Sequence, residues 1–597
     1  MAFSKSPIKY TSRDFDSIKR DLLEHAKRYY PDTYKDFNEA SFGSLMIDTV
    51  AYIGDILSFY LDYQVNESFL DTAVEYNNVI RLSRQMGYKY KANPSSFGEV
   101  AIYAVVPASS TGLGPDAAYL PILKKGSELL SKSGNSFLLD EDVRFDDPAN
   151  EVVVARTSAD TGAPTYYAVR AYGRIVSGKF GVEKKNVGSF EKFKKVQLSS
   201  TNITEILSVV DTEGYDYYEV ENLSQNTVYK EVVNKGDNRD SVPSMLRPMI
   251  VPRRFVLERE ENKLFLQFGY GSSGEIREPS VAEPKNVVLQ LNGRNYITDK
   301  SFDPSRLLKT DKFGIAPSNT TLTVSYRINT TENVNAAAGS VTKITKPIVE
   351  FVNRSSLLAS KVSDIINSLE TFNEDQITGD TTIPSSDELR RMTIDNFASQ
   401  NRAVTQTDYE TLVYSMPEKF GSVKRCKVTR DSDSLRRNLN LYIISEDSSG
   451  KLTPTNNTMK ENLKVWINKS KMISDTIDIL DAKIVNIGIE FEVIADEESN
   501  KFKILSDCNA AIKNLFKVTP FIGQPFYLTE IYSALNKVDG VVDTKRVKIT
   551  KKRGTSYSSS KFDIEEAMSA DGRYLSVPDN VVLEIKYLDT DIKGVIS

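Results

Sequence analysis

The sequence of 597 residues has little of what most enzyme and metal sites are made from. It contains one histidine, His25, and two cysteines, Cys426 and Cys508. A pair of histidine metal ligands is therefore excluded, and two thiols are too few for a disulfide scaffold or a thiolate zinc site. We expect no metal, no cofactor and no catalytic residue, and we expect His25 to be a packing residue on the first helix. The scarcity of cysteine suits a reducing compartment.

An excess of charge of one sign is also missing. The chain has 76 Lys and Arg residues against 81 Asp and Glu residues, which leaves a formal net charge of -5. The basic field of a nucleic-acid-binding surface is therefore absent, and nucleic acid is not an expected partner. The first ten residues lack the apolar stretch of a secretory signal, and no run of about 18 apolar residues occurs without a charge, so no membrane span is expected.

The length exceeds what a single hydrophobic core supports, so several domains are expected. The apolar periodicity changes along the chain and predicts a multidomain α+β protein. Residues 1–97 are expected to form a helical bundle segment, and residues 98–346 a β-rich central region of sandwich-like domains. An insertion is expected there at about residues 150–250. Residues 347–480 and 481–597 are expected to form two α+β modules.

Three helices are predicted in the first region. Thr11 and Asp14 have capping-box spacing and predict the start of the first helix. A second helix is expected over about residues 44–63, and a third over about residues 67–86, with Gly87 as its C-terminal cap. The three helices are expected to form one unit.

The second helix is the most informative segment. Asp48, Asp55 and Asp62 recur every seven residues, which places them on one stripe. Only this stripe is expected to face water, because apolar residues cover most of the remaining circumference. The helix is either the centre of its own domain or is completed by another chain. The candidate partner-helix interface is Met46, Ile47, Val50, Ile53, Ile56, Leu57, Phe59, Tyr60 and Leu61.

The C-terminal half alternates helices and strands. Ser385 with Glu388, and Thr405 with Asp408, have the spacing of capping boxes and predict two helix starts. Apolar and polar residues alternate over 485–493, which predicts a strand with one buried face.

Two segments within this half, 407–428 and 529–547, share the order helix, glycine turn and strand. Similar order at separate places in one chain is the mark of an internal repeat. These two segments suggest a duplicated α+β module as a hypothesis. The number of residues between the helix and the glycine differs between the two segments, which argues against it.

Three stretches carry residue types found in chemical sites. Residues 269–274 are glycine-rich, but neither a Lys-Ser/Thr pair nor a helix follows, so a turn with positive φ is expected rather than a phosphate cradle. Residues 545–553 are basic and are expected to form a solvated strand and turn, with a polyanion patch as the alternative. Residues 211–221 interleave acidic residues with tyrosines, which favours an exposed strand and leaves a glycan hydrolase as the alternative. The acidic residues are Asp211, Glu213, Asp216, Glu219 and Glu221.

Motifs occur in a fixed order along the middle and the end of the chain. They lie at residues 120–137, 268–274, 335–341, 387–410 and 520–532. In this order they resemble the baseplate J family of contractile phage tails, with Tyr270 in place of an aspartate of the family. The resemblance implies structural roles for Gly126, Gly269, Gly271, Gly274, Arg402, Thr405, Asp408, Tyr409, Gly523 and Pro525.

Motifs at residues 36–52, 67–69 and 87–88 are similar to the T4-like branch of the same family. The resemblance implies a wedge subunit that bundles with a second copy of itself and a second wedge protein. It also implies contacts with a small sheath-initiator protein, with neighbouring wedges and with the hub. The expected location is the tail baseplate of a virion, assembled in the host cytoplasm. A receptor-binding adhesin is a further alternative, disfavoured by the long helical segments and the lack of fibrous repeats.

Overall fold

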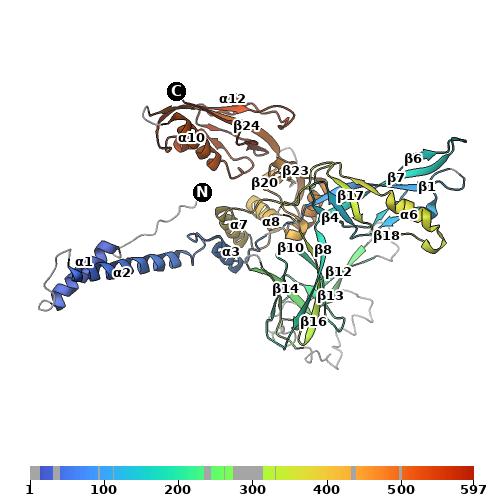
Figure 1. The fold of residues 1–597 in the computed structure, drawn as a ribbon, viewed down its shortest axis with the longest axis horizontal. Helices are drawn as coiled ribbons and strands as arrows, with labels where there is room; N and C mark the ends of the chain where they lie inside the picture. Colours follow the sequence, from blue (N-terminus) through green and yellow to red (C-terminus); the bar gives the residue numbers. More distant parts are fainter. Residues whose placement is uncertain are drawn as a thin grey trace. The chain divides into compact units, whose positions relative to one another are not determined.

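The computed structural model describes residues 14–30, 41–91, 94–111, 113–233, 244–260, 263–272, 313–329, 331, 333–431, 438–496 and 500–596. The chain divides into two compact units. Unit 1 comprises Met1–Tyr90 and Ile383–Asn401, and unit 2 comprises Lys91–Thr382 and Arg402–Ser597. The chain therefore passes between the units three times. The multidomain α+β fold class is confirmed, with helices first, strands in the middle and mixed elements at the end (Figure 1). The four regions predicted from the sequence stay predictions.

Unit 1 is helical in its described part. Helix α1 packs against α2, and α3 packs against α7. All three predicted helices lie in unit 1. Helix α3, however, packs against a helix about 300 residues later in the chain, which the pattern of residues 1–97 could not reveal. The helices are α1 (Phe15–Tyr29), α2 (Phe42–Asn66), α3 (Tyr76–Gln85) and α7 (Ser386–Ser399).

The prediction that the third helix begins near Glu67 is wrong, because α3 begins at Tyr76. The Glu67 carboxylate accepts hydrogen bonds from the backbone N–H of Val74 at 2.7 Å and from Nδ2 of Asn78 at 2.8 Å. These bonds hold residues 67–75 in turns. Burial acts to raise the pKa of Glu67, but the donated hydrogen bonds outweigh it and keep that pKa below its ordinary value. Gly87 has φ +91° and follows α3, as predicted for its C-terminal cap.

The start of α1 differs in detail from the prediction. Thr11 lies outside the described residues, and Asp14 occupies the N-cap position without a side-chain capping bond. Instead, Asp14 accepts a hydrogen bond from the Ser17 hydroxyl at 2.5 Å. The expectation that His25 packs into a core is wrong: it is exposed, and its ring lies 4.7 Å from that of Tyr29. Its neighbours come from the end of its own helix.

Two large sheets form the middle of unit 2. Within the described residues, the first has the order β17-β3-β4-β7-β1-β19, with β6 paired to β7, and the second has the order β8-β16-β10-β11-β14-β15-β9. The core of the first includes Ile102, Phe137 and Ile175, and that of the second includes Phe255 and Leu266. The strands of the first are β1 (Phe97–Pro107), β3 (Glu128–Ser131), β4 (Ser136–Leu139), β6 (Glu151–Thr157), β7 (Pro164–Ser177), β17 (Val341–Lys346) and β19 (Glu370–Phe372). Those of the second are β8 (Lys179–Val187), β9 (Lys195–Gln197), β10 (Ile203–Val210), β11 (Asp216–Glu219), β14 (Arg254–Glu260), β15 (Lys263–Phe268) and β16 (Thr320–Ile328).

Smaller elements complete this part of the unit. Strands β12 and β13 form a hairpin, and β18, β2 and β5 form a short sheet. Helix α6 supplies Val362 and Ile365 to the core of the first large sheet. The bounds are β2 (Ile122–Leu123), β5 (Val143–Arg144), β12 (Thr227–Val233), β13 (Ser244–Ile250), β18 (Val349–Glu350) and α6 (Ala359–Asn367).

The last part of unit 2 contains two α+β arrangements of similar design. Strand β21 pairs antiparallel with β20 and parallel with β23, and strand β24 pairs antiparallel with β26 and parallel with β28 and β29. In both, a helix and a turn precede the antiparallel neighbour, which is the order that suggested a duplication. The elements around β21 are α8 (Gln406–Tyr414), β20 (Arg425–Arg430), β21 (Asn438–Glu446), β22 (Leu452–Thr453), α9 (Asn457–Ile467) and β23 (Thr476–Asp481). Those around β24 are β24 (Lys483–Ala495), α10 (Lys501–Leu515), β25 (Phe526–Tyr527), α11 (Leu528–Leu535), β26 (Val541–Lys551), α12 (Ile564–Ala567), β27 (Tyr574–Leu575), β28 (Val581–Glu584) and β29 (Ile592–Ile596).

Strand β24 is more deeply buried than its alternating sequence predicts. Residues 484–489 are buried on both faces of the sheet, including Asn486. The Asn486 side chain donates to Glu584 Oε2 at 2.7 Å and accepts from the backbone N–H of Ser558 at 2.7 Å. A polar residue was expected to mark the solvent face, but one whose hydrogen bonds are satisfied can be buried at small cost.

Candidate assembly interface

Helix α2 packs on α1 through a stripe of small side chains. Its N-cap is Ser41, whose hydroxyl accepts from the backbone N–H of Ser44 at 3.1 Å. The buried residues of α2 are Ser44, Ala51 and Ser58, spaced seven apart. A methyl group added at Gly54 would lie 3.1 Å from Ile18 of α1. Small residues at this spacing let α1 approach the α2 backbone closely.

The expectation that the aspartate stripe faces water is wrong. Asp48, Asp55 and Asp62 alternate with the small residues on the same side of the helix, and all three are half-buried. Asp48 forms an ion pair with Lys19 of α1 at 2.8 Å. The stripe therefore borders the contact with α1, where Lys19 pairs with its first aspartate.

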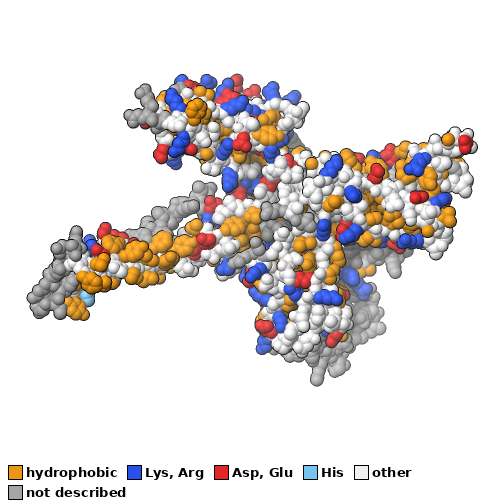
Figure 2. Space-filling view, viewed as in Figure 1, with side chains coloured by type: hydrophobic (Ala, Val, Ile, Leu, Met, Phe, Trp, Pro, Cys, Tyr) orange, Lys and Arg blue, Asp and Glu red, His pale blue; other side chains and the backbone are white. Residues whose placement is uncertain are grey.

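The opposite side of α2 is apolar and exposed. Of the nine residues predicted as the partner-helix interface, Ile47 and Ile56 are half-buried and the other seven are exposed, with Leu57 at 63% and Tyr60 at 62%. Figure 2 shows the hydrophobic side chains running along the helix. By length and composition alone, α2 is also long and apolar enough to cross a membrane. We call the exposed apolar surface of α2, defined by the seven residues Met46, Val50, Ile53, Leu57, Phe59, Tyr60 and Leu61, the α2 face.

The acidic, tyrosine-rich stretch forms part of the β10–β11 hairpin. Asp211 Oδ1 accepts from the backbone N–H groups of Glu213 and Tyr215, both at 2.9 Å, as a turn residue does. Tyr217 is buried in the core of the second sheet, and burial raises the pKa of its hydroxyl to about 12. Within the part of the chain that the structure describes, no cluster of His, Cys, Asp and Glu could hold a metal ion.

The glycines singled out by the resemblance serve the backbone in different ways. Gly126 has φ +90°, which favours glycine. Gly269 and Gly271 are not in that region, so the expected turn with positive φ is wrong for both. A side chain at Gly269 would meet the backbone oxygens of Phe313 and Gly314, and Gly271 forms a parallel bridge with Ile315. Close backbone approach is therefore the reason for glycine at position 269. Gly274 lies outside the described residues.

The motif after Arg402 builds the start of α8. Thr405 Oγ1 accepts from the Asp408 N–H at 3.2 Å, and Asp408 Oδ2 accepts from the Thr405 N–H at 2.8 Å, so the predicted capping box is confirmed. Tyr409 is buried, and its hydroxyl donates to Asp475 Oδ2 at 2.8 Å. Burial, followed by this bond, raises the pKa of Tyr409 to about 12. Arg402 is exposed.

The last two residues implied by the resemblance lie together before β25. Gly523 has φ +72°, and its N–H donates to the Val581 carbonyl oxygen at 2.8 Å. Pro525 is exposed and directly precedes β25. Both shape the chain between α10 and α11. Their roles as family-motif residues stay predictions.

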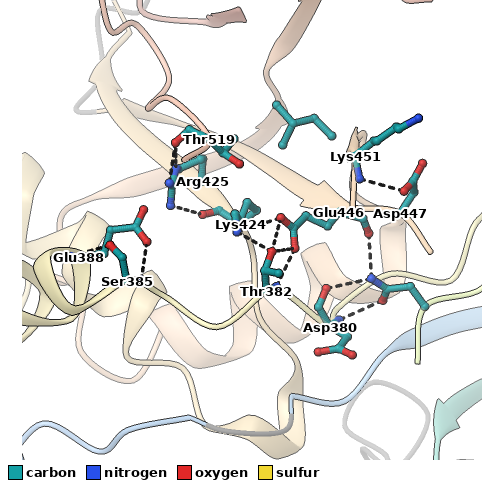
Figure 3. Close-up of polar contacts among 12 residues, drawn as sticks. Asp380, Thr382, Ser385, Glu388, Lys424, Arg425, Glu446, Asp447, Lys451 and Thr519 are labelled. Atoms are coloured by element: carbon teal, nitrogen blue, oxygen red, sulfur yellow. Dashed lines mark hydrogen bonds and ion pairs between the residues drawn. The ribbon is translucent and has the colours of Figure 1, made fainter. Parts of the chain in front are cut away.

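Unit 2 contains a buried polar network that was not predicted from the sequence. Asn335 Oδ1 accepts from the Asp380 N–H at 3.0 Å, and its Nδ2 donates to the carbonyl oxygens of Asp380 at 2.9 Å and Glu446 at 3.0 Å. Ser96 also donates to Asn335 at 2.8 Å. Asn335 lies in one of the family-like motifs, but its partners are far away in sequence, so only the fold reveals them. The asparagine therefore links Asp380 to Glu446 of β21, and Figure 3 shows these two residues.

An ion pair between Lys424 and Glu446 continues this network. Lys424 Nζ lies 2.8 Å from Glu446 Oε1, and the Glu446 side chain is only 4% exposed. The Glu446 carboxylate also accepts from the Thr382 N–H at 2.7 Å and from the Thr382 hydroxyl (Figure 3). Thr382 is the last residue of unit 2 before the chain enters α7. The network therefore anchors the segment at which the chain leaves unit 2.

Replacing Asp380 with Asn is expected to stabilise this region at pH 8 by about 1 to 3 kcal/mol. Burial, and then the charge of Glu446, raise the pKa of Asp380 from 3.8 to about 7. Between these values the folded protein keeps a proton that the unfolded chain has released, so stability falls as the pH rises through this window. The neutral Asn avoids the cost of ionisation.

The measurement is urea unfolding followed by the fluorescence of Trp466, the only tryptophan, which packs in the core around α8 and β21. The stabilisation by Asn should shrink as the pH is lowered towards about 4. Below that pH the carboxyl group of Asp380 is protonated in both the folded and the unfolded protein. A benefit of equal size at pH 8 and pH 4 would show that ionisation of Asp380 is not its cause.

Among the comparisons with known proteins, the family match lies in the segment that contains α1, α2 and α3. No curated protein sequence matches the chain. A chain of the anti-feeding prophage baseplate, solved by cryo-electron microscopy, is 8% identical over 94% of this chain and 89% of that chain, with a TM-score of 0.24. A chain of the type VI secretion system TssK-TssF-TssG baseplate subcomplex is 7% identical over 74% and 96%, with a TM-score of 0.23. TM-scores this low do not establish a shared fold. Residues 14–85 match the family model described as bacteriophage baseplate protein, N-terminal domain, so the segment bearing the α2 face is similar to that domain, which supports a structural role in a virion tail baseplate.

Proposed function

We propose that the protein is a non-enzymatic wedge subunit of the baseplate of a contractile phage tail, of the baseplate J type. In this role it assembles with a second copy of itself and with a second wedge protein. Wedges then close a ring around the hub, contact the small sheath-initiator protein and rearrange when sheath contraction is triggered. The α2 face is the observation that carries the proposal.

The energetic argument follows from the size of the α2 face. Complete burial of an apolar side chain of this size contributes about 1.5 to 3 kcal/mol, so the seven residues could contribute roughly 10 to 20 kcal/mol before entropy is counted. Association costs about 4 to 15 kcal/mol in lost freedom of motion. The α2 face is therefore large enough to support a stable complex. Monomeric proteins seldom leave so large an apolar surface uncovered.

A helical protein partner fits α2 better than a lipid bilayer does. The helix has 25 residues and spans about 37 Å, enough for several turns of contact with partner helices. Helix α1 packs alongside it and carries the exposed charged residues Arg20, Asp21 and Glu24. Taking these charges into a bilayer with α2 would cost several kcal/mol for each of them. Partner helices require no such burial.

A closed ring also needs a second surface on each subunit, because a heterologous contact joins two different patches. The α+β arrangement around β24 is the candidate for contact with neighbouring wedges, as the resemblance implies. Its sheet carries exposed apolar residues at Val542 and Val595. This surface is smaller than the α2 face and supports the proposal only as a second site.

The test is to replace Leu57 with Asp and to measure co-assembly with the second wedge protein of the same tail by size-exclusion chromatography with light scattering. A carboxylate in the centre of the α2 face should abolish the complex, because a buried unpaired charge costs several kcal/mol. The matched control is Ile473→Asp, at a fully exposed apolar position of unit 2, which should assemble normally. Both variants should keep the circular dichroism spectrum of the parent. Normal complexes with Leu57→Asp would contradict the proposal.

A further inference from the structure

Strand β6 is an exposed edge strand of the first large sheet. It pairs antiparallel with β7, and among the strands that the structure describes none pairs with its other edge. All seven residues of β6 are exposed. Three consecutive valines, Val152, Val153 and Val154, form its centre. Proline, lysine or a covering element often protects an edge strand, and β6 has none of these within the described residues; its protection is limited to one bulge and two charged side chains.

An irregularity in β6 decides which side chains share a face. Val154 is opposite Tyr167 and Arg156 is opposite Tyr166, so Ala155 is an extra residue without a partner on β7. Such a bulge restores Arg156 to the face that carries Glu151 and Val153. Two contacts agree with this placement. Glu151 pairs with Arg170 at 2.8 Å, and the Arg156 guanidinium lies 5.6 Å from the centre of the Tyr166 ring.

With the bulged residue left out, the strand is complementary to itself. Its five paired positions are Glu151, Val152, Val153, Val154 and Arg156. In an antiparallel pair of two such strands centred on Val153, each Glu151 lies opposite an Arg156. Each Val152 lies opposite a Val154, and Val153 lies opposite its own copy. Opposite residues then fall on the same face, as a two-fold axis perpendicular to the sheet requires.

We propose that two copies of this chain pair through β6, antiparallel and centred on Val153, so that the first large sheets of the two copies become one continuous sheet. The charge complementarity of Glu151 and Arg156 selects a second copy over an unrelated strand. The inference names a surface for the second copy that the proposed function includes, but it does not depend on the α2 face.

The apolar face of the first large sheet also supports pairing through β6. Val152 and Val154 lie beside Val169 and Tyr167, which are buried in the core of the first large sheet. Yet Val152 and Val154 themselves remain 44% and 45% exposed. The apolar face of the sheet is therefore buried at β7 but remains exposed at β6. Pairing with a second β6 would place valines from both copies side by side there.

The first test uses Val153→Cys in full-length protein that also carries Leu57→Asp, so that association through the α2 face is removed. Opposite side chains in an antiparallel pair have Cβ atoms about 4.5 to 5.5 Å apart, close enough for a disulfide after small adjustments. Mild oxidation should give a covalent dimer. The natural cysteines are both buried and should contribute little background.

The matched control for this test is Val152→Cys in the same strand. In the proposed register it lies opposite Val154 and well away from its own copy, so it should cross-link at least about tenfold less than Val153→Cys. A mixture of Val152→Cys and Val154→Cys chains should cross-link efficiently. Equal cross-linking of Val152→Cys and Val153→Cys, or none in either, would overturn the inference. So would a Val153→Cys cross-link to another tail protein in place of a second copy.

The second test swaps charges and reads association by sedimentation velocity in the same Leu57→Asp protein. Glu151→Arg alone places arginine opposite arginine, and Arg156→Glu alone places glutamate opposite glutamate, so each should weaken self-association about tenfold. An equal mixture of the two variants restores both opposite-charge pairs and should associate as the parent does. Failure of the mixture to recover would reject the register. Loss of co-assembly in Leu57→Asp alone tests the proposed function separately.

Discussion

Glu446→Ala is expected to destabilise the part of unit 2 around β21 by about 3 to 5 kcal/mol. The substitution leaves the Lys424 ammonium, whose side chain is only 11% exposed, without its carboxylate and removes the acceptor of the Thr382 N–H. An uncompensated buried charge costs more than the ion pair itself contributes, because desolvation is no longer offset. Urea unfolding followed by Trp466 fluorescence should show the loss. Hydrogen exchange at the Thr382 amide should accelerate by at least about a hundredfold.

Two further variants separate charge from hydrogen bonding at this site. Glu446→Gln keeps an acceptor for Thr382 but removes the charge, so its loss should be smaller than that of Ala. The double change Lys424→Met with Glu446→Leu removes both charges and should recover much of the stability lost in Glu446→Ala. If the double variant is less stable than Glu446→Ala, the unpaired lysine is not the source of the loss.

Arg390→Ala is expected to destabilise the pair of α3 and α7 by about 3 kcal/mol. The buried guanidinium donates to the carbonyl oxygen of Leu70 at 2.9 Å and also to that of Ala73 and to the Asp387 carboxylate. Without it, the backbone oxygens of residues 67–75 lose a charged donor, and the carboxylate of Glu67 loses a nearby positive charge. Hydrogen exchange over residues 67–90 should speed up about a hundredfold.

The neighbouring Arg391 provides the control for this prediction. Its side chain is 57% exposed and pairs with Asp395 at 3.8 Å. Surface pairs of this kind contribute about 0 to 1 kcal/mol, so Arg391→Ala should leave exchange over residues 67–90 almost unchanged. Equal effects from Arg390 and Arg391 would mean that the general charge of α7, and not the bonds to Leu70 and Ala73, stabilises the turns.

Local signals in the sequence predicted local structure well. The capping boxes at Ser385 and Thr405 are both present, because each depends only on a side chain and a backbone group three residues apart. The apolar circumference of α2 was predicted for the same reason, since helical periodicity alone determines which side chains share a face. Gly87 ends α3 at the predicted position.

Features that depend on distant partners could not be predicted. The sequence shows that Asp48, Asp55 and Asp62 share a stripe, but the side of α2 that meets α1 depends on Lys19 and Ile18. The late start of α3 depends on the bonds that Glu67 accepts. The roles of Asn335 and Glu446 depend on residues brought together from three separate segments. In each case the deciding contact joins residues without a fixed spacing in sequence.

The membership of α7 in unit 1 sets an order of events during synthesis. Leu389 of α7 packs with Val79 and Ile80 of α3, although about 300 residues separate the two helices. A ribosome adds roughly 5 to 20 residues per second, so α3 waits roughly 15 to 60 s after emerging before its partner is made. Throughout that interval the apolar side of α3 is exposed on the nascent chain, where chaperones and chains growing on the same polysome can bind it.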